Sequence, residues 1–264
     1  MKRVTDFARF HAEGQPISMA TCYDAWSARI ISESKIDAVL VGDSLAMVMH
    51  GYPSTVHATT EMMATHTAAV RRGIGESFVV ADVPFPDHRK GLEAAMVSVD
   101  KLAKAGANAV KVEGARGHLD IIHHIVQSGI PVMGHLGLTP QSVNLIGGYR
   151  VQGRDEDGAG KLLEDARSLQ EAGIFSLVLE CVPADLARRV TEDLSIPTIG
   201  IGSGPHCSGQ ILVLQDLLGM NLGFKPRFLR TYLEGADKMI TALNQYDEDV
   251  KASLFPSKEE SFTK

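Results

Sequence analysis

Cysteine is scarce in this chain of 264 residues, whose three cysteines, Cys22, Cys181 and Cys207, lie far apart in the sequence. Three scattered cysteines do not make a disulfide framework, so a reducing compartment is expected. The chain also lacks an apolar run of membrane-spanning length, and its first residues contain no apolar stretch long enough for a signal peptide. These absences lead us to expect a cytoplasmic protein.

Clusters of positive charge are missing as well. The chain has 26 lysines and arginines against 32 aspartates and glutamates, which gives a net charge of -6. Because nucleic-acid binding needs clustered lysine and arginine, a nucleic-acid partner is not expected. Hydrophobic residues make up 44% of the chain and charged residues 22%, which is the ordinary composition of a soluble globular enzyme.

A dinucleotide-binding glycine fingerprint is absent after the first predicted strand, at residues 17–21, and no linker-like shift in composition divides the chain. What is present is an alternation of short apolar strands with amphipathic helices. Further strands are predicted at residues 38–44, 78–82, 109–114, 131–135, 176–180 and 197–202. Helices are predicted at residues 4–13, 21–35, 59–73, 91–106, 119–127, 161–173, 184–194 and 226–245. Ala25, Ala28, Ile30 and Ile31 are predicted on one apolar side of the second helix, and Met62, Ala69 and Val70 on the inward side of the third. Residues 209–219 fit either a strand or a helix.

Strand and helix in alternation predict a parallel sheet with right-handed crossovers. Seven or eight such units favour a closed barrel over an open sheet. We therefore predict one α/β domain over residues 1–264, a (β/α)8 TIM barrel with an N-terminal helix and a polar C-terminal tail at about residues 247–264. In barrels of this kind the active site lies at the C-terminal ends of the strands.

Polar residues stand at the ends of five successive predicted strands. They are Asp43, Asp82, Glu113, His135 and Glu180. Lys111 lies two residues before Glu113, so the two side chains share one face of their strand. A single acid after an apolar run is usually a turn or a helix cap, but five polar strand ends in succession indicate a common site.

Asp43, Asp82 and Glu113 offer oxygen ligands, which suit a hard cation such as Mg²⁺. No Cys/His ligand spacing competes with them. For Asp43 alone, the alternative is that it caps a helix or binds a backbone amide. Lys111 is either an ion-pair partner of Glu113 or a contact for a substrate carboxylate, because a lysine inside a barrel mouth needs an anion nearby.

Glu180 follows Leu177, Val178 and Leu179, so desolvation is expected to favour its neutral form and to suit it as a general base near neutral pH. His135 competes for that role, or is a core histidine with its hydrogen bonds satisfied. The segment IGIGSG, residues 199–204, is a weak candidate for a phosphate site. The loop at residues 138–153 is long and rich in glycine, and we hypothesise that it is a lid.

At these residues the chain resembles the ketopantoate hydroxymethyltransferase (3-methyl-2-oxobutanoate hydroxymethyltransferase) family. The resemblance covers about residues 21–219. It is carried by VGDSLAMVMHGYPST, THTAAVRRG, ADVPF, VKVEG, GHLGLTPQSVN with GGYRVQGR, LVLECVP, and IPTIGIGSG with GQILVLQDLLG. Where many relatives have GIGAG, this chain has GIGSG at residues 200–204, a change that we do not expect to matter.

The resemblance implies a (β/α)8 enzyme of pantothenate biosynthesis, the route to coenzyme A. Its reaction transfers a hydroxymethyl group from 5,10-methylenetetrahydrofolate to 3-methyl-2-oxobutanoate, giving ketopantoate and tetrahydrofolate. It further implies a homo-oligomer, commonly a decamer, whose partners are these small molecules and not a nucleic acid or a membrane.

The resemblance also implies roles for single residues. Asp43 and Asp82 would bind one Mg²⁺ per subunit, with Glu113 in the coordination sphere directly or through water, and the ion would stabilise an enolate of the substrate. Glu180 would be the base that takes the C3 proton. The substrate-binding set is Asp43, Ser44, Asp82, Lys111 and His135.

Two other interpretations stay open at this point. Another Mg²⁺-dependent 2-oxo acid enzyme on the same barrel, such as a carbon-carbon lyase or a relative of phosphoenolpyruvate mutase, also needs acids at strand ends. A non-catalytic metabolite-binding barrel would use the same acids for ligand affinity alone.

Overall fold

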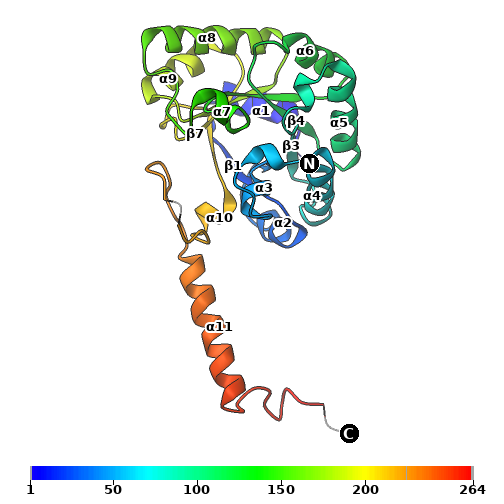
Figure 1. The fold of residues 1–264 in the computed structure, drawn as a ribbon, viewed down its shortest axis with the longest axis vertical. Coiled ribbons are helices and arrows are strands. Elements are labelled where there is room, and N and C mark those ends of the chain that lie inside the picture. The colour runs from blue at the N-terminus through cyan, green and yellow to red at the C-terminus, as the bar shows by residue number, and fades with distance from the viewer. Residues whose placement is uncertain (1, 224, 263–264) are drawn as a thin grey trace. The chain divides into compact units, whose positions relative to one another are not determined.

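Eight parallel strands close into a barrel in the computed structural model, which describes residues 2–223 and 225–262 (Figure 1). Each strand pairs with the next in chain order, and β8 pairs with β1 to close the ring. The strands are β1 (Ile17–Thr21), β2 (Ala38–Val41), β3 (Phe78–Asp82), β4 (Ala109–Glu113), β5 (Val132–Gly137), β6 (Ser176–Glu180), β7 (Thr198–Ile201) and β8 (Gly209–Leu212). The predicted (β/α)8 barrel is confirmed.

Helices connect the strands and form the outer ring, as α5, α6 and α8 do in Figure 1. The helices before β8 are α1 (Val4–Ala12), α2 (Ala25–Ser32), α3 (Leu45–Val48), α4 (Thr60–Gly73), α5 (Leu92–Lys104), α6 (Leu119–Gln127), α7 (Val143–Ile146), α8 (Glu156–Glu171) and α9 (Ala184–Asp193). Three 3-10 turns are η1 (Thr55–His57), η2 (Asp87–Arg89) and η3 (Pro140–Ser142). In the described part of the chain, no helix has both the length and the apolarity that a membrane span requires.

Two positions predicted on the apolar sides of helices are less buried than expected. Ile30 is 54% exposed on α2, whereas Ala28 and Ile31, predicted on the same side, are buried, because a helix of eight residues has room for only a narrow buried stripe. On α4, Val70 is buried as predicted, whereas Met62 is half-buried and its neighbour Met63 is buried.

Residues 209–219, which fitted either a strand or a helix, contain one of each: β8 ends at Leu212, and the short helix α10 (Leu214–Leu217) follows. The strand begins at Gly209, where a Cβ atom would lie 2.3 Å from the carbonyl oxygen of Ile17 on β1. Glycine is therefore needed where the last strand closes on the first. The predicted helix at 161–173 begins five residues earlier, at Glu156, because Asp155 accepts a hydrogen bond from Gly158 N and caps it.

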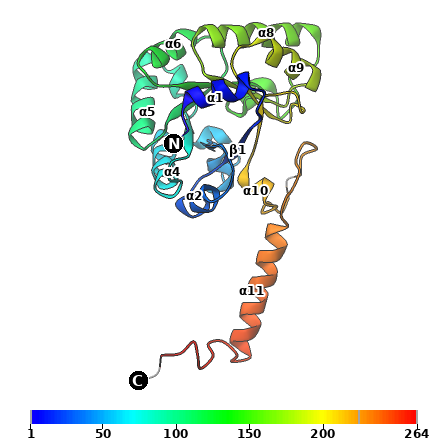
Figure 2. The ribbon, with the colours of Figure 1, turned by 180° about the vertical axis from the view of Figure 1, so that it is seen from behind.

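An apolar cluster fills the amino-terminal end of the barrel, and α1 lies across that end (Figure 2). Phe7 of α1 packs edge-on against Phe175 with ring centroids 5.3 Å apart, and against Phe78 of β3 at 5.1 Å. Inward side chains of the strands, from Ile17 and Met19 of β1 to Ile211 of β8, complete this cluster. The amino end of the barrel is therefore a packed core and not a pore.

The chain divides into two compact units, with the boundary between Val213 and Leu214. The second unit contains α10 and α11 (Gly235–Lys251). The helix predicted at Pro226 was wrong at both ends: it begins nine residues later, where Gly235 N and Ala236 N bond the carbonyls of Leu218 and Gly219, and it runs into the predicted polar tail. A single domain over the whole chain stays a prediction.

Candidate active site at the carboxyl end of the barrel

All seven residues predicted for the site line one small cavity at the carboxyl ends of the strands. Its volume is about 110 Å³. The seven are Asp43, Ser44, Asp82, Lys111, Glu113, His135 and Glu180. Residues separated by up to 137 positions in the sequence are thus brought together by the closure of the barrel.

The parallel register explains this convergence. Asp82 of β3 pairs with Lys111 of β4, and Glu113 of β4 pairs with His135 of β5. Because inward side chains recur every two residues, the register brings these groups together at the carboxyl end of the barrel, beyond apolar inward residues such as Met19 and Val80. The strands thus change from apolar to charged along their length.

Asp43 and Ser44 lie just beyond β2, in the turn that leads into α3. Asp43 N donates to Asp82 Oδ2 at 2.9 Å, so the turn is tied to the neighbouring strand. Ser44 is the residue before α3 and makes no side-chain cap bond; its Oγ instead lies 2.8 Å from the buried Tyr23 hydroxyl. Asp43 therefore does not cap α3, and its carboxylate is directed to the cluster.

Lys111 is a buried ammonium surrounded by carboxylates. Its Nζ lies 2.9 Å from Asp82 Oδ1 and 3.5 Å from Glu113 Oε1. Burial would lower the pKa of Lys111, but Asp82, Glu113 and Asp43 raise it above its ordinary value. Burial would likewise raise the pKa of Glu113, yet Lys111 and His135 beside it lower that pKa to about 2. Lys111 and Glu113 are therefore charged at neutral pH.

The cluster holds more carboxyl groups than basic groups, which disfavours ionisation of its two aspartates. Burial, then Asp82 and Glu113, raise the pKa of Asp43 well above its ordinary value. The pKa of Asp82 is also raised, mainly by burial, although Lys111 opposes the shift. Three fully buried carboxylates with one ammonium form a set of oxygen donors whose charge a divalent cation would balance.

The donor set fits Mg²⁺ in its chemistry, while its side chains are at present bonded to each other. Among the described residues, no group of three or more His, Cys, Asp or Glu side chains has metal-binding geometry. The reason is visible in the contacts: Lys111 Nζ lies against Asp82, and the Gln141 side-chain amide donates to Asp43 Oδ2 at 2.9 Å.

His135 links the acid cluster to Glu180. Its Nδ1 lies 3.1 Å from Glu113 Oε1, and its Nε2 lies 3.3 Å from Glu180 Oε2. Burial and Lys111 lower the pKa of His135, whereas Glu113 and Glu180 raise it, and the balance is about 9. An imidazolium between two carboxylates would hold the Glu180 side chain in place.

Glu180 is the most accessible carboxylate of the cluster, with 19% of its side chain exposed, against 2% for Asp82 and Glu113. The next residue, Cys181, has φ 48°, a left-handed conformation that residues with a side chain rarely adopt. Backbone strain of this kind concentrates at functional sites. Glu180 is thus placed where it can meet a substrate.

The opposite wall of the same cavity is apolar. It is formed by Leu40, Val178, Ile201, Ile211, Leu212 and Val213. The charged groups come from β3 to β6 and the turn after β2, whereas β7 and β8 contribute apolar side chains. The cavity therefore suits a small molecule with anionic oxygens at one end and an aliphatic group at the other.

Sequence reasoning missed two polar residues of this site. Gln141, in the turn η3 after β5, is 3% exposed and hydrogen-bonds both Asp43 and Glu113. Tyr23, two residues beyond β1, is fully buried and holds Ser44. Tyr23 follows a predicted strand by two residues, as Asp43 follows the apolar run at 38–41. Gln141 lies six residues beyond the predicted strand at 131–135, where no such signal marks it.

Other sequence candidates lie outside the cavity. His123 and His124 are exposed on α6. Ser203 of the IGIGSG segment is fully buried, where its hydroxyl donates to Leu179 O at 2.7 Å and accepts from Val182 N at 3.2 Å. This serine ties the turn after β7 to the end of β6, which gives it a structural role.

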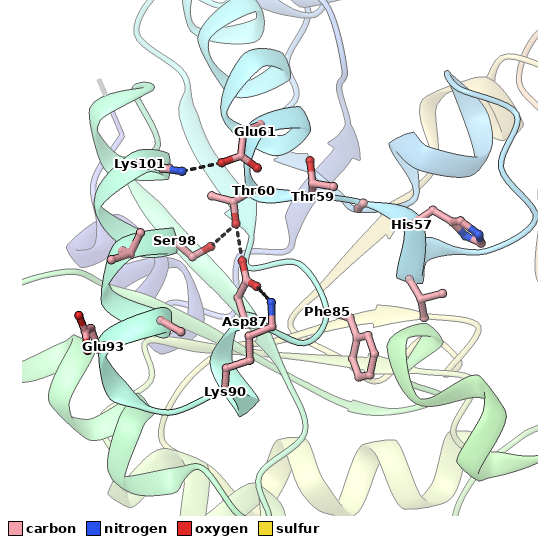
Figure 3. Close-up of a pocket in the computed structure, with 14 residues that line it drawn as sticks. His57, Thr59, Thr60, Glu61, Phe85, Asp87, Lys90, Glu93, Ser98 and Lys101 are labelled. Atoms are coloured by element: carbon pink, nitrogen blue, oxygen red, sulfur yellow. Dashed lines mark hydrogen bonds and ion pairs between the residues drawn. The ribbon is translucent and has the colours of Figure 1, made fainter.

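A larger cavity of about 700 Å³ lies elsewhere, between η1, α4, η2 and α5 (Figure 3). Figure 3 shows that its polar side chains face one another: Thr60 Oγ1 donates to Asp87 Oδ2 and lies 2.9 Å from Ser98 Oγ, and Lys90 Nζ donates to Asp87 Oδ1 at 2.8 Å. Lys101 pairs with Glu61. None of the predicted site residues lines it, so its size does not make it the better candidate.

Comparisons with known proteins agree on one family. The family model described as ketopantoate hydroxymethyltransferase matches residues 1–258. A protein of Bdellovibrio bacteriovorus named 3-methyl-2-oxobutanoate hydroxymethyltransferase is 58% identical over 263 residues, which cover 100% of both chains. A protein of Coxiella burnetii with the same name is 54% identical over 252 residues, 95% of each chain.

Solved structures with the same fold are more distant. A 2,3-dimethylmalate lyase of the PEP mutase/isocitrate lyase superfamily has a TM-score of 0.63 at 16% identity, covering 100% of this chain and 93% of that one. A phosphonopyruvate hydrolase solved with oxalate and Mg²⁺ has a TM-score of 0.64 at 10% identity, covering 98% and 93%. At these identities the likeness shows the barrel fold alone.

Proposed function

The chain belongs to the ketopantoate hydroxymethyltransferase family and is an enzyme of that family, and from this premise we propose its reaction in detail. It transfers a hydroxymethyl group from 5,10-methylenetetrahydrofolate to 3-methyl-2-oxobutanoate, giving ketopantoate and tetrahydrofolate. We place the reaction in pantothenate biosynthesis and the protein in the cytoplasm. The observation that carries the proposal is the divided cavity, with carboxylates and an ammonium on one wall and aliphatic side chains on the other.

The substrate has the same division. Its keto and carboxylate oxygens suit the charged wall, where Lys111 offsets the carboxylate charge and Ser44, held by Tyr23, can donate to an oxygen. Its isopropyl group suits the wall made by Leu40, Ile201 and Ile211. This orientation directs C3 of the substrate away from the acids of β3 and β4.

Asp43 and Asp82 are the residues that would hold Mg²⁺, with Glu113 beside them. Their carboxylates are fully buried and exceed the positive charge around them, which supports a divalent partner. The ion, when bound, would supply positive charge where negative charge develops on the keto oxygen after loss of the C3 proton. Lys111 stays charged beside it because three carboxylates raise its pKa.

Glu180 is the proposed base. It is the most exposed carboxylate of the cluster, and His135 fixes its orientation from the side of β5. A base in this position takes the proton from C3, and the resulting carbon nucleophile forms a C–C bond to the methylene carbon of the folate. Both C–N bonds of that carbon break, and one water supplies the hydroxyl oxygen of ketopantoate. The protons from C3 and from the water supply the two N–H groups of tetrahydrofolate and the new hydroxyl. His135 also faces Glu113, so it keeps the base at a set distance from the charged wall.

The segment 138–153 is suited to cover the reacting groups. Both ends are tied to the end of β6, by Leu138 N to Glu180 O at 2.8 Å and by Gln152 N to Cys181 O at 2.9 Å. Between these anchors, Leu145 is 90% exposed. A segment with fixed ends and an exposed apolar middle can close over a substrate and shield the reacting groups from bulk water.

The helix α11 supports the proposal of a homo-oligomer, commonly a decamer in this family. Its exposed apolar residues recur at helical spacing: Met239, Ile240, Leu243, Tyr246 and Val250. An apolar stripe of this kind is typical of a surface that packs against another chain. Light scattering on the purified protein tests it, and a monomer at micromolar concentration would rule it out.

The reaction is tested by incubating the protein with 3-methyl-2-oxobutanoate, 5,10-methylenetetrahydrofolate and Mg²⁺, with product followed by NMR. We expect ketopantoate to form, and to stop forming when EDTA removes the ion. Parallel assays with 2,3-dimethylmalate and phosphonopyruvate examine the lyase and hydrolase chemistry found on this fold. Turnover of either one without formation of ketopantoate would overturn the proposal.

A further inference from the structure

Gln141 connects three strand ends of the barrel mouth, although it lies on the turn η3. Its backbone N donates to Glu113 Oε2 at 3.0 Å. Its side-chain Nε2 donates to Asp43 Oδ2 at 2.9 Å and to the carbonyl oxygen of Val83 at 3.0 Å. One residue thus fixes two acids of the proposed metal site relative to each other and to the end of β3.

The orientation of the Gln141 amide follows from its neighbours. Asp43 Oδ2 and the Val83 carbonyl are both acceptors, so the group that faces them must be the donor NH₂. The reverse orientation would place the amide oxygen against a carboxylate and a carbonyl. Oε1 is therefore the end of the amide that has no hydrogen-bond partner among the described residues.

Two buried oxygens at this place have no hydrogen-bond partner among the described residues, Gln141 Oε1 and Thr55 Oγ1. Gln141 is 3% exposed and Thr55 is 2% exposed. The turns that carry them, η3 and η1, contact each other, and both Thr55 and Pro140 line the small cavity. A buried acceptor without a donor is unfavourable, and the usual partner in a polar site is an ordered water.

We propose that Gln141 is a positioning residue for the divalent cation: it spaces the Asp43 and Glu113 carboxylates and accepts a hydrogen bond, through Oε1, from a water on that cation. Thr55 Oγ1 bonds the same hydration shell. Mg²⁺ retains several waters when it is bound through carboxylates, and residues that hold such a shell commonly change metal affinity by about 10–100-fold. The inference rests on the proposed function, because it assumes the magnesium site.

The test is Mg²⁺ binding by isothermal titration calorimetry on the full chain without either substrate. Gln141→Met keeps the side-chain length and the backbone bond to Glu113 and removes the amide. We expect its Kd for Mg²⁺ to rise at least about tenfold. Gln170→Met is the matched control, since Gln170 accepts bonds from Ser195 on the outer face, and its Kd should stay within about twofold of the unchanged protein.

Three outcomes decide the inference. If Gln141→Met binds Mg²⁺ within twofold of the unchanged protein, with or without a lower melting temperature, Gln141 is structural and the inference fails. If the unchanged protein binds no Mg²⁺, the proposed metal site fails first. If both bind and the variant is at least tenfold weaker while Gln170→Met is not, the inference holds.

Thr55→Val provides an independent variant if Gln141→Met does not fold. It replaces a buried hydroxyl that has no protein partner with a methyl group of similar size, so the Mg²⁺-free protein should melt at the same temperature or higher. Its Kd for Mg²⁺ should nevertheless rise by more than about twofold. An unchanged Kd would overturn the assignment of these oxygens to the hydration shell.

Discussion

At its amino end the barrel is closed by Phe7, Phe78 and Phe175, whose ring centroids lie 5.1 to 5.9 Å apart, whereas its carboxyl end holds an ammonium among buried carboxylates. The same strands build both ends. On β3 the inward residues run from Phe78 through Val80 to Asp82, so two steps of two residues separate the core from the site.

The difference shows which end contributes stability and which contributes chemistry. Burial of aromatic and aliphatic surface stabilises the amino end by about 25 cal/mol for each Å² removed from water. Burial of Asp43 and Asp82 is unfavourable to their ionised forms, as their raised pKa values indicate. The free energy gained by packing at the amino end therefore offsets the unfavourable burial of charged groups at the carboxyl end. Substitutions at the two ends should consequently have separable effects, on stability at the amino end and on activity at the carboxyl end.

The largest effect is expected from Glu180→Gln at the carboxyl end. The amide cannot accept the C3 proton, so product formation should fall by about 10²–10⁴-fold while the melting temperature hardly changes. Exchange of the C3 hydrogen of 3-methyl-2-oxobutanoate with deuterium, followed by NMR, should fall with it. Glu93→Gln, in the larger outer cavity, is the control and should keep full activity. Ordinary exchange in Glu180→Gln would remove Glu180 as the base.

A large effect on stability, with no effect on activity, is expected from Phe7→Ala at the amino end. Phe7 is 1% exposed, and loss of its ring should lower the free energy of unfolding by about 3–5 kcal/mol. Urea unfolding measures this, and kcat/KM at 25 °C should stay unchanged. Phe262→Ala, where the ring is fully exposed, should change stability by less than about 0.5 kcal/mol. A loss of kcat/KM in folded Phe7→Ala would show that the two ends are coupled.

Asp82→Asn is expected to weaken Mg²⁺ binding about tenfold or more, because it removes one charged oxygen ligand from the proposed set. Calorimetric titration with Mg²⁺ measures the change. Asp87→Asn is a matched control that removes a carboxylate bonded by Thr60 and Lys90 in the outer cavity, away from the small one. Equal Mg²⁺ affinities for the two variants would argue against Asp82 as a ligand.

The smallest effect concerns a carboxylate at the amino end of β2. Burial would raise the pKa of Asp37, but hydrogen bonds from Lys2 Nζ and from Ser18 N and Oγ lower it. Since the folded-state pKa is the lower one, the contribution is present above the unfolded value of about 3.9 and is lost as the pH falls through the folded-state pKa.

Asp37→Asn should therefore lower stability at pH 7 by less than about 1 kcal/mol, because this pair is partly exposed and screened by solvent. The difference from the unchanged protein should shrink as the pH falls below about 4. Urea unfolding at pH 7 and pH 3 measures it, with Mg²⁺ absent and present. If the stability difference between Asp37→Asn and the unchanged protein depended on Mg²⁺, the two ends of the barrel would not be energetically independent.

Much of this architecture could be predicted from the sequence because each strand of a parallel sheet has its own local pattern, a short run of apolar residues. Continuous apolar runs such as residues 38–41 mark strands covered on both faces, and the acids that follow four of the runs mark the barrel mouth. Helix faces were less certain. A shift of one residue, which separates Met62 from Met63, turns a helix by about 100° and changes which side chain is buried.

What could not be predicted depends on contacts between distant loops. Gln141 bonds Asp43 across 98 positions, and nothing in the local pattern of the glycine-rich segment indicates that partner. The start of α11 was missed for a similar reason, because it is set by the carbonyls of Leu218 and Gly219 and not by helix propensity after Pro226. Helix propensity depends on the residues of one segment, whereas the start of α11 and the position of Gln141 depend on hydrogen bonds between two segments.

The most direct measurement is a crystal structure of the protein grown with Mn²⁺ and 3-methyl-2-oxobutanoate, with the ion located by anomalous scattering. The account predicts one ion bound by Asp43 and Asp82, with the oxo acid against Lys111, its isopropyl group against Ile201 and Ile211, and C3 facing Glu180. An ion or oxo acid bound instead in the outer cavity beside Asp87, with the barrel mouth holding neither, would contradict it.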